Sequence, residues 1–197
     1  MRNINPKPCW NEYFMIMAKI TATRSTCASR PVGAVIVKDR HILASGYNGA
    51  PQDEWHCTDV GECYWRKQVE QGQVKEGVNP PDLSRAIHAE INAIGQSAKL
   101  GVSTEGATLY TTLSPCINCF KAIVAAGISA VYYEHLYDYN ENMKITLLGL
   151  YTTYSKNVYV GQIQPRAEIL YAVSQSILSP TSARQHDQYK TYTINGE

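Results

Sequence analysis

The pattern of apolar and polar residues in the first part of the chain predicts a helix followed by a hairpin. Apolar residues recur at helical spacing, which predicts a helix over residues 10–23. Pro31 then precedes a run of mostly β-branched residues, 32–37, of the kind found in buried strands. A polar turn at residues 38–41 separates this run from Ile42–Tyr47, so the two segments are expected to pair as a hairpin.

Helical and strand patterns alternate in the middle of the chain. The expected elements are, in order, a helix over 84–99, a strand over 108–112, a helix over 117–126 that Gly127 ends, and a strand over 128–133. Such an alternation predicts an α/β layered domain whose sheet is mostly parallel beyond the opening hairpin.

The pattern is weaker in two other regions. Residues 52–84 are irregular, with one charged segment, 64–71, that has some helical character. Beyond Asp138 the sequence predicts helices over 143–153 and 167–177 and a strand over 158–163. We expect a single domain over residues 1–179 and a polar, loosely ordered tail over 180–197.

Composition and charge narrow the classes of protein. The formal net charge of +1 argues against a strong electrostatic grip on a nucleic acid polymer, although it leaves room for a small phosphorylated ligand. Residues 1–10 hold no apolar run typical of a signal peptide, and no stretch approaches the length of a membrane span. The six cysteines are therefore expected to be reduced in a cytoplasmic protein, some of them as metal-bound thiolates and Cys9 as a small apolar residue near the first helix.

Two short motifs carry the candidate chemistry: His88-Ala89-Glu90 and Pro115-Cys116-Ile117-Asn118-Cys119. If Pro115 opens a helix, the two thiols lie on one face about one turn apart, at the end of the helix dipole that favours thiolates. His88 adds a nitrogen ligand. Three protein ligands leave one position of a tetrahedral zinc open for water, whose pKa zinc lowers from about 15.7 to roughly 7.

Glu90 is expected to stay off the metal and to carry a proton to and from that water. Neither motif alone is specific for a catalytic zinc. A C-x-x-C pair is often a structural zinc knuckle or a redox pair, and an H-x-E sequence by itself is a very weak signal. Together and in this order they form the pattern that the zinc-dependent nucleobase deaminases share.

Several stretches together resemble the deoxycytidylate (dCMP) deaminases, including the bacteriophage enzymes. The resemblance covers residues 10–138 and rests on four segments, namely 32–37, 45–51, 87–94 and 106–119. It implies a three-layer α/β/α fold around a mixed five-stranded sheet, a zinc-dependent hydrolysis of dCMP to dUMP and ammonia, and a cytoplasmic location in a bacterium or a phage-infected bacterial host. It also implies a homo-hexamer that dCTP activates and dTTP inhibits.

The resemblance also assigns roles to individual residues. Thr112 and Ser114 match positions that line the base pocket, Asn48 matches an asparagine that faces the sugar, and Tyr137 matches an aromatic residue near the pocket. The alternatives are that Asn48 is a turn residue and that Tyr137 only packs.

A second, structural zinc is a further implication of the resemblance. Phage and bacterial members often hold it with cysteines at the positions of Cys27 and Cys57, and Cys63 and His56 are candidates to complete the site. The long irregular segment 52–84 gives independent support, because such a loop needs a reason to be ordered. The alternative is that Cys63 and His56 are ordinary loop residues.

The effector site is expected around Gly46, Tyr47, Asn48 and Gly49, where glycines let backbone N–H groups approach the phosphates of a triphosphate with its Mg²⁺. Lys99 matches a family position linked to the effector response, and its alternative is a solvated helix cation.

Two other functions compete with dCMP deamination. The same chemistry could act on cytidine, dCTP or a 5-substituted dCMP. A non-catalytic zinc protein acting in DNA uptake or assembly is a different class, against which the intact Glu90 and the open metal position argue.

Overall fold

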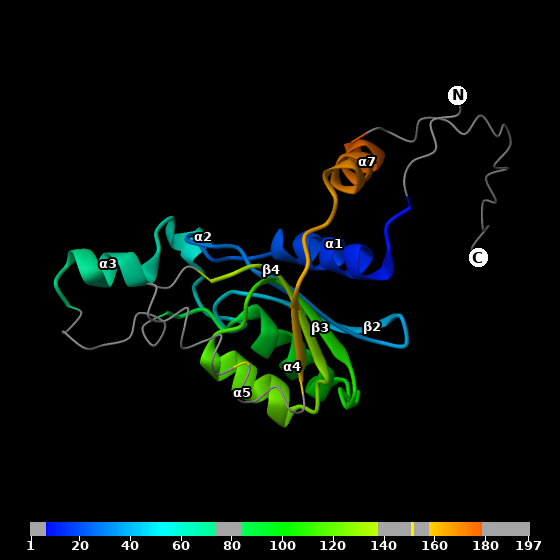
Figure 1. Cartoon of the computed structure of the whole chain (residues 1–197). Helices are drawn as coiled ribbons and strands as arrows, with labels where there is room; N and C mark the ends of the chain where they lie inside the picture. The colour runs from blue at the N-terminus through cyan, green and yellow to red at the C-terminus, as the bar shows by residue number, and fades with distance from the viewer. Residues whose placement is uncertain (1–6, 74–83, 138–150, 152–157, 179–197) are drawn as a thin grey trace, which may run out of the picture. The chain divides into compact units, whose positions relative to one another are not determined.

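The computed structural model describes residues 7–73, 84–137, 151 and 158–178 (Figure 1). The backbone forms two compact units. The larger lies within residues 8–165 and the smaller contains Lys7 and the chain from Arg166 onward. The described part of the smaller unit holds helix α7, Ala167–Leu178, where an ion pair of 3.1 Å joins Arg166 to Glu168.

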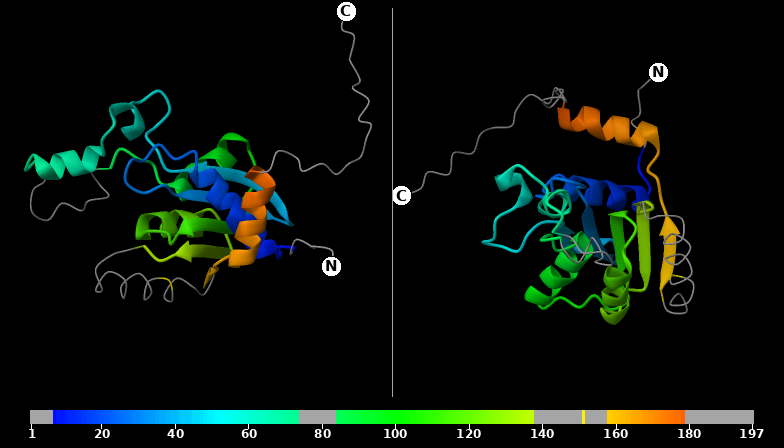
Figure 2. Two further views of the ribbon diagram at one scale, coloured as in Figure 1. Left: turned by 90° about the horizontal axis from the view of Figure 1, so that it is seen from above. Right: turned by 90° about the vertical axis from the view of Figure 1, so that its left-hand side faces the viewer.

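A five-stranded mixed sheet forms the centre of the larger unit, in the order β2-β1-β3-β4-β5. β1 pairs antiparallel with both β2 and β3, whereas β3, β4 and β5 run parallel, with β5 as the outer strand in Figure 2. The strands are β1 (Gly33–Lys38), β2 (His41–Tyr47), β3 (Thr108–Leu113), β4 (Ala130–His135) and β5 (Tyr159–Gln162). The predicted mixed five-stranded α/β fold is confirmed.

Helix α1, Trp10–Ala22, covers one face of this sheet (Figure 1). Its buried Phe14, Met15 and Ala18 pack on side chains that point to this face from β1 and β3. The helix approaches β1 closely because Gly33 has no side chain: a Cβ there would lie 2.2 Å from the carbonyl oxygen of Ala18.

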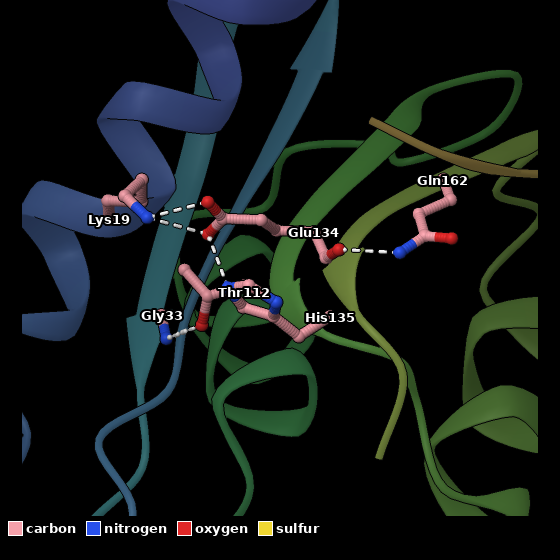
Figure 3. Close-up of polar contacts among 6 residues, drawn as sticks. All are labelled: Lys19, Gly33, Thr112, Glu134, His135 and Gln162. Carbon is pink, nitrogen blue, oxygen red and sulfur yellow. Dashed lines mark hydrogen bonds and ion pairs between the residues drawn. The ribbon is translucent and has the colours of Figure 1, made fainter. Parts of the chain in front are cut away.

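An ion pair also joins helix α1 to strand β4. Lys19 donates to both carboxylate oxygens of Glu134 on β4, at 2.7 Å each (Figure 3). The backbone carbonyl of Glu134 accepts a hydrogen bond of 2.9 Å from the side chain of Gln162 on β5. Glu134 therefore connects three elements through one residue.

Helices α4 (Ala89–Lys99) and α5 (Ile117–Ala125) cover the opposite face, which completes three layers (Figure 1). The main core lies here and includes Ile36, Leu109, Phe120 and Val131, each less than 1% exposed. Strand residues alternate between the two faces, so neighbours in sequence point to different layers. The polar residues Thr112 and Glu134 share the α1 face with Tyr110 and Tyr132.

Helix α4 begins later than its sequence pattern predicts. The predicted start at Ser84 is wrong, because Ile87 pairs with Gly49 through two backbone hydrogen bonds of 2.8 and 3.2 Å. This bridge keeps the chain extended up to His88, which caps the helix. The contact between Ile87 and the distant Gly49 therefore sets the N-terminus of α4, and the local pattern of apolar residues does not predict it.

The irregular region contains two short helices, α2 (Cys57–Val60) and α3 (Tyr64–Glu70), so the helical character of residues 64–71 is confirmed. The predicted helix over 143–153 lies outside the described residues except for Tyr151, as does the tail over 180–197. Among the described helices, none combines the length and apolar character that crossing a membrane requires.

Candidate metal centre

Both motifs lie at helix N-termini. His88 is the N-cap of α4, with extended backbone angles of φ −69° and ψ 152°. Cys116 is the N-cap of α5, with φ −70° and ψ 168°, and Cys119 follows in the first turn of that helix. Since α4 and α5 lie on the same face of the sheet, their N-termini bring the two motifs together.

His88, Cys116 and Cys119 form the one group of three or more possible metal ligands among the described residues, with ligand atoms all within 4.8 Å of one another. The His88 Nδ1 atom lies 3.3 Å from the Cys119 sulfur and 3.5 Å from the Cys116 sulfur. Ligands on a tetrahedral zinc, at their usual bond lengths, would be roughly 3.6 Å apart. The donor set therefore fits zinc, and Nδ1 is the nitrogen that faces it.

The electrostatics of the group suit a cation. A hydrogen bond from the Cys119 thiol, together with one from His88, lowers the pKa of Cys116 to about 4 despite its burial. Cys119 keeps its proton in that bond, which with burial raises its pKa. The hydrogen bond with Cys116 likewise raises the pKa of His88. A bound cation would take the place of the shared proton and leave both sulfurs as thiolates.

Glu90 lies beside these ligands in the first turn of α4 and is only 4% exposed. Burial is the main cause that raises its pKa, to about 7, against the opposing effect of the nearby His88. The Cys119 thiol and the Glu90 carboxylate are close enough for each to shift the pKa of the other. The site thus places an acid of near-neutral pKa next to three metal ligands.

A comparison with protein families identifies this arrangement. Residues 8–135 match the model of the cytidine and deoxycytidylate deaminase zinc-binding region. The chain belongs to this family. The family resemblance seen in the sequence is therefore confirmed, and so is zinc as the metal for which the region is named.

Curated relatives extend the comparison. The chain is 44% identical over 128 residues to ComE operon protein 2 of Bacillus subtilis strain 168, a match that spans 65% of this chain and 60% of that protein. It is 36% identical over 149 residues to the deoxycytidylate deaminase of Enterobacteria phage T4, covering 64% of this chain and 77% of the phage protein. The deoxycytidylate deaminase of Mycobacterium phage D29 is 39% identical over 127 residues, 64% of this chain and 95% of its own.

Solved structures agree with the fold. The dCMP deaminase of cyanophage S-TIM5 in complex with dCMP and dUMP matches with a TM-score of 0.57 and 31% identity. That match covers 80% of this chain and 99% of the phage enzyme.

Two of the residues predicted to bind substrate lie next to the metal ligands. Ser114, only 1% exposed, precedes Pro115 and Cys116, and its hydroxyl accepts the backbone N–H of Tyr137 at 2.9 Å. The guanidinium of Arg30 lies over the ring of Tyr137, 5.3 Å from its centroid. The sequence patterns did not single out Arg30, because an isolated arginine in a loop carries no periodic or motif signal.

Thr112 lies elsewhere. Its hydroxyl accepts the backbone N–H of Gly33 at 3.2 Å (Figure 3). Its side chain lines a cavity of about 460 Å³ together with Lys19 and Glu134. This cavity is on the α1 face, whereas the metal ligands are on the α4 and α5 face. Strand alternation turns Thr112 away from the metal, so the structure gives no support to its predicted place in the base pocket.

The side chain of Asn48 makes three hydrogen bonds within the described part of the chain. Its side-chain oxygen accepts from the backbone N–H of Val32 at 2.8 Å and from the Ser25 hydroxyl at 2.6 Å, and its amide donates to the Arg30 carbonyl at 2.9 Å. These bonds hold the loop between α1 and β1. They favour the turn-residue interpretation of Asn48, although contact with a sugar stays a prediction.

The predicted effector segment is also engaged within the chain. The backbone N–H of Asn48 bonds to Val32 at 3.1 Å and that of Gly49 to Ile87 at 3.2 Å, so these two donors do not face a phosphate. Gly46 and Tyr47 lie in β2, and a Cβ on Gly46 would lie 2.3 Å from the Ala89 carbonyl. Lys99, the last residue of α4, is exposed.

The candidate ligands of a second zinc are not gathered in the described structure. No second group of three ligand atoms forms among the described residues, although Cys27, His56, Cys57 and Cys63 are all described. The Nδ1 atom of His56 lies at hydrogen-bonding distance, 2.9 Å, from the Thr26 hydroxyl. The second site stays a prediction that metal analysis tests.

Proposed function

We propose that this protein hydrolyses dCMP to dUMP and ammonia. The observation that supports this most directly is the buried carboxylate of Glu90 beside the three ligands His88, Cys116 and Cys119. Three ligands and an adjacent unligated acid are the parts that a hydrolytic deaminase needs.

The roles follow from the chemistry of the groups. A zinc ion held by the three ligands would supply a polarised water of near-neutral pKa. Glu90 accepts a proton from the attacking water and delivers protons to the adjacent ring nitrogen and to the departing amine. At the ring carbon a C–O bond forms and the C–N bond breaks, so that the oxygen stays on the base and the nitrogen leaves as ammonia.

The relatives support dCMP as the substrate. The phage T4 and D29 relatives are named deoxycytidylate deaminases, and the S-TIM5 enzyme was solved with dCMP and dUMP. The guanidinium of Arg30, which lies over the ring of Tyr137, is a cation that would suit a phosphorylated substrate.

Ammonia release from dCMP, cytidine, dCTP and 5-methyl-dCMP, with and without a chelator, tests this function. The proposal expects dCMP to be the preferred substrate and the chelator to abolish its turnover. A site built around the 5′-phosphate should turn over cytidine by orders of magnitude more slowly. Faster turnover of dCTP or cytidine would identify a related deaminase, and no release from any of the four would favour the non-catalytic zinc protein.

We further propose that the protein is a homo-hexamer activated by dCTP with Mg²⁺ and inhibited by dTTP. Membership in the family and the position of Lys99 support this. Lys99 lies nine residues, about 13 Å, along α4 from Glu90. Tenfold activation at low dCMP would need about 1.4 kcal/mol of coupling. Rate curves with each triphosphate and light scattering of the purified protein test it, and unchanged hyperbolic curves from a monomer would contradict it.

A further inference from the structure

A tyrosine far from both motifs in the sequence contacts residues 115–120, which hold both cysteine ligands and are called the metal-binding turn below. Tyr151 is 3% exposed and its hydroxyl donates a hydrogen bond to the backbone carbonyl of Pro115. Pro115 is itself buried and immediately precedes Cys116.

The ring of the same tyrosine contacts the other end of this turn. Its centroid lies 4.7 Å from that of Phe120, with the planes at 48°. Phe120 directly follows Cys119, and its backbone N–H bonds to the carbonyl of Cys116 at 2.8 Å. Tyr151 thus contacts the residue before the first cysteine ligand and the residue after the second.

The Pro115 carbonyl needs this partner. It is buried, and a buried acceptor left without a hydrogen bond is unfavourable. If the Tyr151 hydroxyl is removed, the Pro115 carbonyl loses its donor, and the peptide between Pro115 and Cys116 can rotate until the carbonyl meets another one. That rotation would move the Cys116 sulfur relative to His88, because Cys116 is the N-cap that sets the direction of the turn.

We propose that Tyr151 is a positioning residue of the metal centre, which fixes the Cys116–Cys119 turn in the geometry that zinc requires. This rests on the proposed function only in taking the three ligands to hold zinc. Groups that orient metal ligands without touching the metal typically contribute 10- to 100-fold to metal affinity. The alternative is that Tyr151 contributes only to core packing and does not affect metal binding.

Tyr151→Phe separates the two explanations, because it keeps the ring on Phe120 and removes only the hydroxyl. The chain offers a matched control in Tyr110, which is 5% exposed and donates a hydrogen bond of 2.7 Å to Asn11. Tyr110 lies on the α1 face of the sheet, away from the metal ligands. Y110F therefore removes a comparable hydroxyl hydrogen bond without touching the metal-binding turn.

Zinc affinity of the wild type and both variants is measured by competition with a chromophoric chelator. The Co²⁺-loaded forms are compared by their visible absorption spectra. The proposal expects Y151F to bind zinc 10- to 100-fold more weakly and to show an altered Co²⁺ spectrum, and Y110F to match the wild type in both. Thermal unfolding should show a similar loss of stability in the two variants.

An unchanged affinity and spectrum in Y151F, or equal changes in both variants, would overturn the proposal. Neither readout depends on dCMP, so a wild type that binds zinc without releasing ammonia contradicts the proposed function alone. A wild type that binds no zinc would contradict both.

Discussion

At the scale of single residues, a few polar side chains hold the larger unit together from within. The Asn48 amide fixes the loop before β1, and the buried carboxylate of Glu134 ties α1 to the sheet. Each is the kind of buried polar group that stabilises only while its partners remain. These hydrogen bonds and this ion pair explain why Asn48 and Glu134 are polar although both residues are buried.

The Lys19–Glu134 pair should respond unequally to the loss of either partner. The side chain of Glu134 is 7% exposed and that of Lys19 35% exposed. Lys19→Met leaves a buried carboxylate without its main cation and should lower the free energy of unfolding by about 2–4 kcal/mol, whereas Glu134→Gln leaves a lysine that can reach water and should cost about 1 kcal/mol. Urea unfolding of both variants measures this, and equal losses would contradict it.

At the scale of elements, close contact between α4 and β2 sets the position of both His88 and Glu90. This contact depends on Gly46, since a Cβ there would lie 2.3 Å from the Ala89 carbonyl and 2.4 Å from the Ala93 nitrogen. The atoms it would strike belong to the backbone of α4, so the helix itself would have to move. A glycine that the sequence suggested for an effector loop is thus required for packing.

Gly46→Ala should therefore lower the free energy of unfolding by about 1–3 kcal/mol and reduce dCMP turnover by displacing Glu90. Gly95→Ala in the same helix is the matched control, because a Cβ there meets nothing within 4 Å. It should stabilise the protein by about 0.5–1 kcal/mol and leave turnover unchanged. If both substitutions have the same effect, the packing argument fails.

At the scale of the whole molecule, the sequence predicts the order of elements well and their details less well. The helices and strands of the larger unit have strong periodic patterns, and the metal ligands form a motif whose spacing alone suggests zinc. The start of α4 depends on the pairing of Ile87 with the distant Gly49, which local patterns do not contain. Strand alternation is visible in the sequence, but which face of the sheet carries the metal ligands is not, so the face of Thr112 could not be assigned. Tyr151 escaped prediction because its partner Pro115 lies 36 residues away.

One prediction for the whole molecule concerns the number of zinc ions that each chain binds. The family resemblance predicts two, one at His88, Cys116 and Cys119 and one involving Cys27 and Cys57. Replacing Cys27 and Cys57 together with serine should then lower the zinc content by one and reduce stability, while some turnover remains. Metal analysis that finds a single zinc in the wild type would remove the second site.

The measurement that tests the central claim most directly is the dCMP turnover of Glu90→Gln at known zinc content. Glu90 is not one of the three ligands, so the variant should keep the zinc of that site. Its amide cannot carry a proton, so turnover should fall by about 10²- to 10⁴-fold. Glu105→Gln, an exposed acid outside the site, should behave like the wild type. Near wild-type turnover in zinc-loaded Glu90→Gln would contradict the role of this residue and, with it, the proposed mechanism.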